Sequence, residues 1–266
     1  MVPILTYHSQ NIRGARPADN DHAALAADLE ALISTGKTVI PLDRMMEWLE
    51  GNLDERAVTN SVVMTFDDGC DFDVRDIEYP GHGMQRSFLG IMQDFLERFP
   101  ASGKPSLHAT SFVIASWEAR HQIDAGSLFG EGWMSDDWWN EADANPLLSI
   151  ENHGWDHNHP DLEGDERGNF HSVDNREQCM EQVVHAAESI GHLTGRRPHY
   201  FAYPFGESSQ YIREIFFPEY PELHGCRAAV GTDPGLVHPD TDLWNLPRFV
   251  CGRDWTSPEE LLNLLG

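Results

Sequence analysis

The sequence predicts an α/β protein built on a parallel sheet that is either open or closed into a barrel. Short apolar runs alternate with helical patterns along the whole chain of 266 residues. This alternation is typical of repeated strand–helix–strand units, in which helices cover the faces of the sheet. The chain contains no internal repeat and no low-complexity tract, so we expect a single domain spanning residues 1–266.

Strands are expected where short apolar runs end at Gly, Pro or polar residues. Runs of this length, rich in Val, Ile and Phe, fit strands that are buried on both faces. The run SVVMTF at 61–66 is the clearest, because it is mostly apolar and is followed by two aspartates. The predicted strands span residues 3–7, 37–42, 61–66, 107–115, 147–152, 199–203, 227–232 and 246–250.

Helices are expected where apolar residues recur at helical spacing. Asp21 is the expected N-cap of the first helix, and Asp174 with Glu177 forms an expected capping box. Gly195 is expected to end that later helix, and Ser257 to cap the last one. The predicted helices span residues 21–35, 85–99, 174–195, 208–217 and 257–265.

The chain is strongly acidic. It carries 18 basic and 44 acidic residues, for a formal net charge of −26. We therefore expect neither nucleic acid nor an anionic membrane as a partner. A solvated surface explains this charge without any function, although a cationic substrate would also fit it. The sequence does not indicate an oligomeric state.

The cysteines and the first residues bear on the location of the protein. The four cysteines are scattered and form no CxxC pair, as expected for reduced thiols. The segment MVPILTYHSQ at 1–10 has neither the basic residues nor the long apolar run of a signal peptide. We expect a cytoplasmic protein, or an extracellular or periplasmic one if a leader has been removed.

Histidines gather after the predicted strand at 147–152, and the ends of strands are where such folds place their chemistry. His153 and His157 would share one side of a helical turn, whereas His157 and His159 would share one side of an extended loop. Both pairs suit a metal such as zinc. A polar loop in a chain with 14 histidines is the alternative. An HExxH helix is excluded because Gly154 follows His153.

Two adjacent carboxylates, Asp67 and Asp68, follow the most apolar predicted strand. Such neighbours repel each other near a core and stay ionised only beside a positive charge. In extended backbone they point in opposite directions, so they need not share a role. One carboxylate with two histidines makes three ligands and leaves a position open for water, as in catalytic metal sites. The other carboxylate would then be the base, and a solvated turn with Gly69 at positive φ is the alternative.

Three motifs, in order, resemble the polysaccharide deacetylase family, which is also known as the NodB-homology family or carbohydrate esterase family 4. They are TFDDG at 65–69, NHGWDH at 152–157 and FAYPFG at 201–206. HATSFVI at 108–114 resembles the strand between the first two motifs. VPILTYHS at 2–9 and LPRFV at 246–250 resemble the ends of members whose domain is circularly rearranged.

The resemblance implies a distorted (β/α) barrel of about seven strands, with its site at the carboxyl ends of the strands. It also implies a metal-dependent amide hydrolase with N-acetyl sugars as the usual substrates. Asp67 matches the general base of the family, and Asp68, His153 and His157 match its metal ligands. The implied cofactor is one divalent ion, zinc before cobalt or nickel. His159 is the reserve ligand.

The third motif is expected to hold the reacting carbonyl. The backbone N–H of Phe205 matches the donor that helps the metal to stabilise the oxyanion in the family. Gly206 and Tyr203, in the same motif, are expected to face the substrate or the oxyanion.

The chain departs from the family pattern at two positions. Ala202 stands where many members have an Arg that orients the base. We expect Arg248 to take that role, with a structural salt bridge as the alternative. The LxxH motif, whose His protonates the leaving amine, is missing from the C-terminus and occurs instead at 5–8. His8 is therefore the expected acid, and a hydrogen-bonded histidine that caps a strand is the alternative.

The leading hypothesis is a metal-dependent hydrolase that removes an N-acyl group, foremost acetyl, from an amino-sugar polysaccharide or oligosaccharide. An amidase for a small or cyclic amide is the second hypothesis, favoured by the missing signal peptide. A non-catalytic carbohydrate-binding module is the third, and the complete set of base and ligand positions argues against it.

Overall fold

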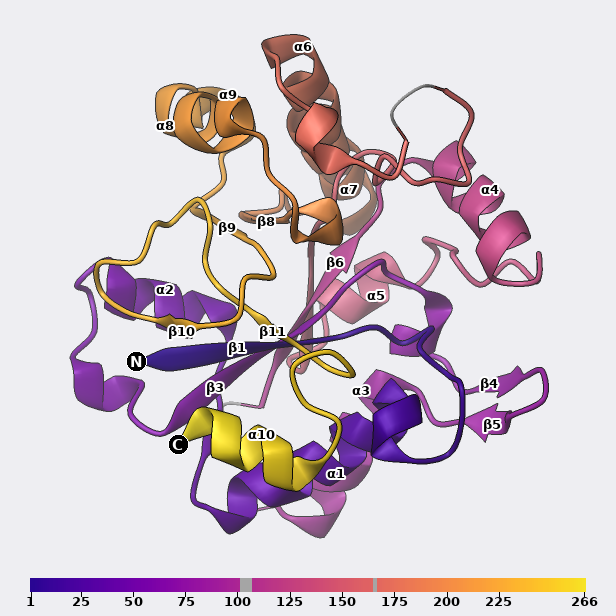
Figure 1. Ribbon diagram of the computed structural model, residues 1–266, viewed down its shortest axis with the longest axis vertical. Coiled ribbons are helices and arrows are strands. Elements are labelled where there is room, and N and C mark those ends of the chain that lie inside the picture. Colours follow the sequence, from indigo (N-terminus) through magenta and orange to yellow (C-terminus); the bar gives the residue numbers. More distant parts are fainter. Residues whose placement is uncertain (101–106, 165–166) are drawn as a thin grey trace.

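A single curled sheet surrounded by helices forms the centre of the molecule (Figure 1). The computed structural model describes residues 1–100, 107–164 and 167–266. Within them, the main path of the sheet has the order β10-β1-β3-β6-β7-β8-β9, and each neighbouring pair is parallel except β10 with β1. The strands are β1 (Val2–Tyr7), β2 (Thr38–Val39), β3 (Ser61–Phe66), β4 (Ile77–Tyr79), β5 (Gly83–Gln85), β6 (Ala109–Val113), β7 (Leu148–Asn152), β8 (Tyr200–Ala202), β9 (Ala228–Val230), β10 (Leu236–Val237) and β11 (Phe249–Val250).

Residues 246–250, here called the closing segment, join the two edges of this sheet. Leu246 forms a parallel bridge with Val230 of β9, and its N–H donates to the carbonyl oxygen of Ala229 at 2.9 Å. At its other end, Phe249 pairs in parallel with Leu5 of β1. The closing segment thus links the last strand of the path to β1, which confirms the distorted barrel.

Helices surround the strands in Figure 1, where α1 contacts α3 and α10 below the sheet and α5 and α7 pack on β7. The α-helices are α1 (Asp21–Ser34), α2 (Leu42–Leu49), α3 (Phe88–Arg98), α4 (Trp117–Ser127), α5 (Trp139–Asp143), α6 (Arg176–Cys179), α7 (Ala186–Thr194), α8 (Phe217–Glu219), α9 (Pro221–His224) and α10 (Pro258–Leu265). The 3-10 turns are η1 (Pro17–Asp19), η2 (Glu55–Ala57), η3 (Asp71–Asp73), η4 (Phe170–Ser172) and η6 (Pro204–Gly206), and the π-helical turns are η5 (Met180–His185) and η7 (Ile212–Phe216).

Burial on both faces explains why the central strands have nearly continuous apolar sequences. Every residue of β1 and of β3 is buried, because helices cover the outer face and side chains fill the barrel. Two of the polar exceptions pair with each other: the hydroxyl oxygens of Thr6 and Thr65 lie 3.0 Å apart. None of the helices in the three described ranges is long and apolar enough to cross a bilayer.

The structure confirms most predicted elements but corrects two helix starts. Asn20, not Asp21, caps α1, because the Asn20 side-chain oxygen accepts hydrogen bonds from backbone N–H groups of the first turn. Asn175, not Asp174, caps α6 in the same way. The later helix does end at Gly195, whose φ is +80°.

Some elements were not predicted because their apolar residues are few or irregularly spaced. The run at 37–42 was predicted as one strand, but only Thr38–Val39 is a strand and Leu42 begins α2. Helices α4 and α5 and the β4–β5 hairpin were also missed. The hairpin and α4 lie beside the strand ends that carry the predicted site, so this omission affects the description of the cavity below.

A buried carboxyl group, Asp73, ties together three strand ends. Asp73 follows β3 and is fully buried. Its two oxygens accept hydrogen bonds from the hydroxyls of Ser9, after β1, and Ser111, in β6, at 2.6 and 2.7 Å. Burial raises the pKa of Asp73 to about 7, in spite of these two hydrogen bonds.

The raised pKa makes stability depend on pH. Between the unfolded pKa near 4 and the folded pKa near 7, the folded chain keeps a proton that the unfolded chain has released. The resulting stability is complete below about pH 4 and is lost as the pH rises through 7. Asp73→Asn should therefore gain stability relative to wild type as the pH rises, by roughly 2–4 kcal/mol between pH 4 and pH 8.

Denaturant unfolding of both proteins at several pH values measures this difference. Asp240→Asn, at an exposed carboxylate, is the matched control and should track the wild type. If wild type and Asp73→Asn show parallel curves over this range, the folded pKa of Asp73 is not raised.

Candidate metal-binding active site

The predicted site residues meet at the carboxyl edge of the sheet. Asp67 and Asp68 follow β3, and His153 follows β7, two strands further along the sheet. Three residues of the site hold positive φ without being glycine: Asp68 at +77°, His157 at +62° and Phe205 at +59°. Such conformations cost about 1–3 kcal/mol each and cluster at functional sites. Gly69, at φ +70°, lies so close to Val113 that a Cβ atom would stand 2.6 Å from the Val113 side chain.

Asp68, His153 and His157 form a group of potential metal ligands. Oδ1 of Asp68 lies 3.4 Å from Nε2 of His153 and 3.4 Å from Nε2 of His157. The ligand atoms of the three residues all lie within 4.8 Å of one another. Nδ1 of His153 lies 2.8 Å from the carbonyl oxygen of Ala202 and must donate to it, so the lone pair of Nε2 faces Asp68. This arrangement fits a divalent ion held by one oxygen and two nitrogens.

The protonation states of His157 and Asp68 also fit a bound cation. Burial and the neighbouring His153 lower the pKa of His157 to about 3, so its imidazole is neutral and able to ligate. Burial would raise the pKa of Asp68, but the neighbouring His153 and His157 hold it well below the usual range. Asp68 therefore stays ionised. The negative charge of the site is the kind that a metal ion neutralises.

Asp67 is not part of this ligand group, because Arg248 binds both oxygens of its carboxylate. Both side chains are buried, and two parallel hydrogen bonds join them: Nη1 to Oδ1 and Nη2 to Oδ2, each 2.7 Å. Arg248 also donates from Nε to the carbonyl oxygen of Gly231 at 2.7 Å and from Nη1 to the hydroxyl of Thr65 at 3.1 Å. Burial would raise the pKa of Asp67, but the Arg248 charge outweighs it, so this pKa lies below its ordinary value. Arg248 thus lies against Asp67, where the predicted orienting role requires it.

His8 lines the cavity from the end of β1, where the LxxH pattern predicts it. Its backbone N–H donates to Oδ2 of Asp21 at 2.8 Å, which explains why Asp21 is not the cap of α1. Its ring Nδ1 is buried and has no hydrogen-bond partner among the described residues. His8 therefore faces the site without being held in one tautomer by the protein.

The third motif contributes less than predicted. Phe205 lines the cavity and its ring packs edge-on against His157, with centroids 4.5 Å apart. The prediction for Tyr203 is wrong: its side chain is fully buried, and its hydroxyl donates to the carbonyl oxygen of Trp244. Gly206 lines the cavity, but its N–H donates to the Tyr203 carbonyl at 2.9 Å and is not free for an oxyanion.

Gly206 instead has a steric role. It holds φ +72°, and a Cβ atom there would stand 1.9 Å from the hydroxyl oxygen of Thr232. Only glycine lets the loop approach so closely. The motif therefore places Phe205 by backbone packing, and its expected oxyanion donor is the Phe205 N–H alone.

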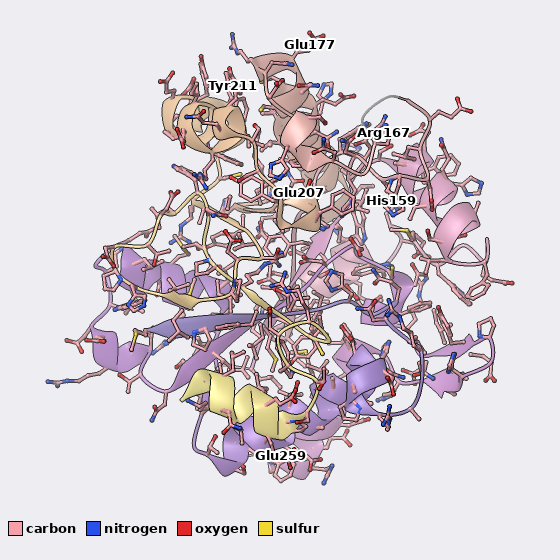
Figure 2. All side chains as sticks on the ribbon, in the orientation of Figure 1. His159, Arg167, Glu177, Glu207, Tyr211 and Glu259 are labelled. Carbon is pink, nitrogen blue, oxygen red and sulfur yellow. The ribbon has the colours of Figure 1, made fainter. Side chains whose placement is uncertain are left out.

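His159 is not part of the group of metal ligands. Figure 2 labels it on the loop after β7, where it lines the cavity and its ring lies 5.7 Å from that of His157. The N–H of Asp161 donates to its Nδ1 at 3.2 Å. The geometry favours Asp68, His153 and His157 as the ligands without help from the reserve histidine.

Residues 54–216, more than half of the chain, match the family model described as polysaccharide deacetylase. The chain belongs to the polysaccharide deacetylase family. No curated protein sequence matches it significantly.

Solved structures share the fold of this polysaccharide deacetylase at low sequence identity. The Streptococcus pyogenes deacetylase PplD, solved in complex with acetate, is 17% identical, with a TM-score of 0.66 over 100% of this chain and 98% of that one. IcaB from Ammonifex degensii is 17% identical, with a TM-score of 0.66 over 99% of this chain and 96% of that one. A polysaccharide deacetylase from Bacillus cereus is 19% identical, with a TM-score of 0.63 over 100% of this chain and 69% of that one.

The deacetylase cavity, of about 350 Å³, also includes residues that the sequence did not single out. Gln10 donates from Nε2 to Oδ2 of Asp68, and its Oε1 lies 3.7 Å from the thiol of Cys70. Tyr79 comes from the unpredicted hairpin, and Arg253 follows the closing segment. These residues have no sequence signal, because only the fold brings them to the strand ends.

The pairing of Arg248 with Asp67 predicts a specific defect. Arg248→Lys keeps the charge but cannot make both hydrogen bonds, so Asp67 should lose its fixed orientation. We expect the rate of N-acetyl hydrolysis to fall by about 10²-fold in kcat with metal content retained, because small misplacements cost that much. The acid limb of the pH–rate profile should move to higher pH, since weaker hydrogen bonding raises the pKa of Asp67.

Arg227→Lys is the control, because Arg227 also forms ion pairs, but at the surface and with two carboxylates, Asp43 and Glu50. That variant should keep the wild-type kcat and pH profile. An unchanged kcat and acid limb in Arg248→Lys would show that Arg248 is structural and does not position the base.

Proposed function

We propose that this protein is a metal-dependent hydrolase that removes an N-acyl group, foremost acetyl, from an amino-sugar polysaccharide or oligosaccharide. The bond cleaved is a carbon–nitrogen bond that is not a peptide bond. The observation that carries the proposal is that two adjacent carboxylates have different partners. Asp68 joins two histidines in a ligand group, while Asp67 is bound by Arg248 beside the same cavity.

The cofactor we propose is zinc, bound by Asp68, His153 and His157. One carboxylate and two imidazoles suit zinc, and cobalt or nickel would accept the same ligands. When bound, such an ion lowers the pKa of a ligated water and polarises the amide carbonyl.

The residues of the chain supply the proton transfers. Asp67, kept ionised and oriented by Arg248, takes a proton from the attacking water. The Phe205 N–H donates to the carbonyl oxygen as negative charge develops there, a contribution worth roughly 3–4 kcal/mol. His8, on the opposite side of the aspartates from β6, gives a proton to the departing amine.

A comparison of two substrates with matched acyl groups tests these roles. Acetate release is measured from N-acetylglucosamine oligosaccharides and from an acetylated aryl ester, whose leaving group needs no proton. We expect Asp67→Asn to lose about 10²- to 10⁴-fold in turnover on both substrates. His8→Ala should lose a similar factor on the amide but much less on the ester, with metal content unchanged in both variants.

His192→Ala, at an exposed histidine of α7 that does not line the cavity, is the control and should behave as wild type on both substrates. Peptidoglycan fragments and small amides extend the same screen. No acetate release from any N-acetyl sugar would contradict the proposed function. An equal loss on ester and amide in His8→Ala would contradict only the role of His8.

A further inference from the structure

One wall of the active-site cavity is apolar to a degree that an acetyl group does not explain. The side chains on this wall come from the ends of β3 and β6, from α4 and from the loop after α4. They are buried and packed together, yet each lines the cavity beside the ligand group. We call this wall the apolar recess: Cys70, Ile114, Ile123, Leu128 and Met134.

Two polar side chains beside the recess already have hydrogen-bond partners within the protein. The hydroxyl of Ser127 donates to Asp161 at 2.6 Å, and Gln10 donates to Asp68. Sugar hydroxyls placed against this wall would lose their hydrogen bonds to water without regaining them, which opposes binding. The recess therefore suits an apolar part of the substrate and not a further sugar ring.

Strand order shows which part of the substrate lies there. In the sheet, β3 lies between β1 and β6, so Asp67 and Asp68 stand between His8 on one side and Ile114 on the other. If His8 protonates the amine, the amino sugar lies on the β1 side of the scissile bond. The acyl group then points toward β6 and the recess.

We propose that the apolar recess is the acyl-binding subsite and that it accepts an aliphatic N-acyl chain longer than acetyl. The proposal rests on the proposed function, because it uses the same scissile bond and the same role for His8. The reaction adds the oxygen of one water to the acyl carbon and breaks the carbon–nitrogen bond. The nitrogen keeps the electron pair of that bond and takes a proton from His8. The proton taken by Asp67 passes to solvent, from which His8 is recharged. The products are an amine and a carboxylic acid, which releases its remaining proton to solvent as it becomes a carboxylate.

Chain-length dependence tests the proposal. The chitobiose disaccharide carrying N-acetyl, N-propionyl, N-butyryl or N-hexanoyl groups is hydrolysed, and the free amine is measured. We expect kcat/KM to rise by about fourfold for each added CH₂ until the recess is full, because each CH₂ leaves water. Equilibrium binding of the same series to Asp67→Asn, which turns over poorly, should follow the same order.

Two substitutions of opposite effect locate the subsite. Leu128→Phe fills the recess and should lower the ratio of kcat/KM for butyryl over acetyl. Met134→Ala enlarges it and should shift the preferred chain to hexanoyl. The matched control is Ala125→Leu, at an exposed position of α4, which should leave the chain-length profile unchanged.

If one recess variant fails to fold, the other and the wild-type series still decide the outcome. Hydrolysis of the N-acetyl sugar with rejection of longer chains would overturn the acyl subsite but leave the proposed function intact. So would a wild-type preference for longer chains that neither recess variant alters. No hydrolysis of any N-acyl sugar would overturn the proposed function as well.

Discussion

The buried ion pair between Arg248 and Asp67 is the interaction on which the rest of the site depends. Two neighbouring carboxylates follow the buried strand β3, and both cannot stay ionised without positive charge nearby. Arg248 binds Asp67 through two hydrogen bonds and leaves Asp68 to the histidines. Removing one partner of such a buried pair destabilises the folded protein by about 3–5 kcal/mol, because the other charge stays buried without a partner. In the proposed mechanism, the pair therefore determines which aspartate is the base and which is the metal ligand.

The same pair explains how the barrel is closed. Arg248 lies in the middle of the closing segment, between the bridge of Leu246 to β9 and the pairing of Phe249 with β1. Its side chain reaches across the interior to the carbonyl oxygen of Gly231, after β9, and to Thr65 of β3. Closure of the sheet and orientation of the base are thus parts of one hydrogen-bond network. His8 directly follows β1, the strand that pairs with the closing segment, and lines the same cavity.

The positions of the central residues could be predicted from the sequence, because carboxyl ends of parallel strands meet at one edge of a sheet. Asp68, His153 and His157 follow this rule, and the structure brings them together. The errors arise where the direction of a side chain, or a hydrogen bond of the backbone, determines whether a residue is available to the substrate. Tyr203 follows a three-residue strand and its side chain turns into the core, and the N–H of Gly206 is used within its own turn. The apolar recess combines β3, β6 and an unpredicted helix, so no local pattern encodes it.

The central claim is that Asp68, together with His153 and His157, binds one divalent ion, and that Asp67 is not a ligand of this ion. Calorimetric titration of the metal-stripped protein with zinc tests this claim directly, with Asp68→Ala, Asp67→Asn and His159→Ala alongside. We predict one ion per chain for the wild type, for Asp67→Asn and for His159→Ala, and loss of binding in Asp68→Ala. Equal binding by Asp68→Ala, or loss of binding in Asp67→Asn or His159→Ala alone, would contradict the division of the two aspartates.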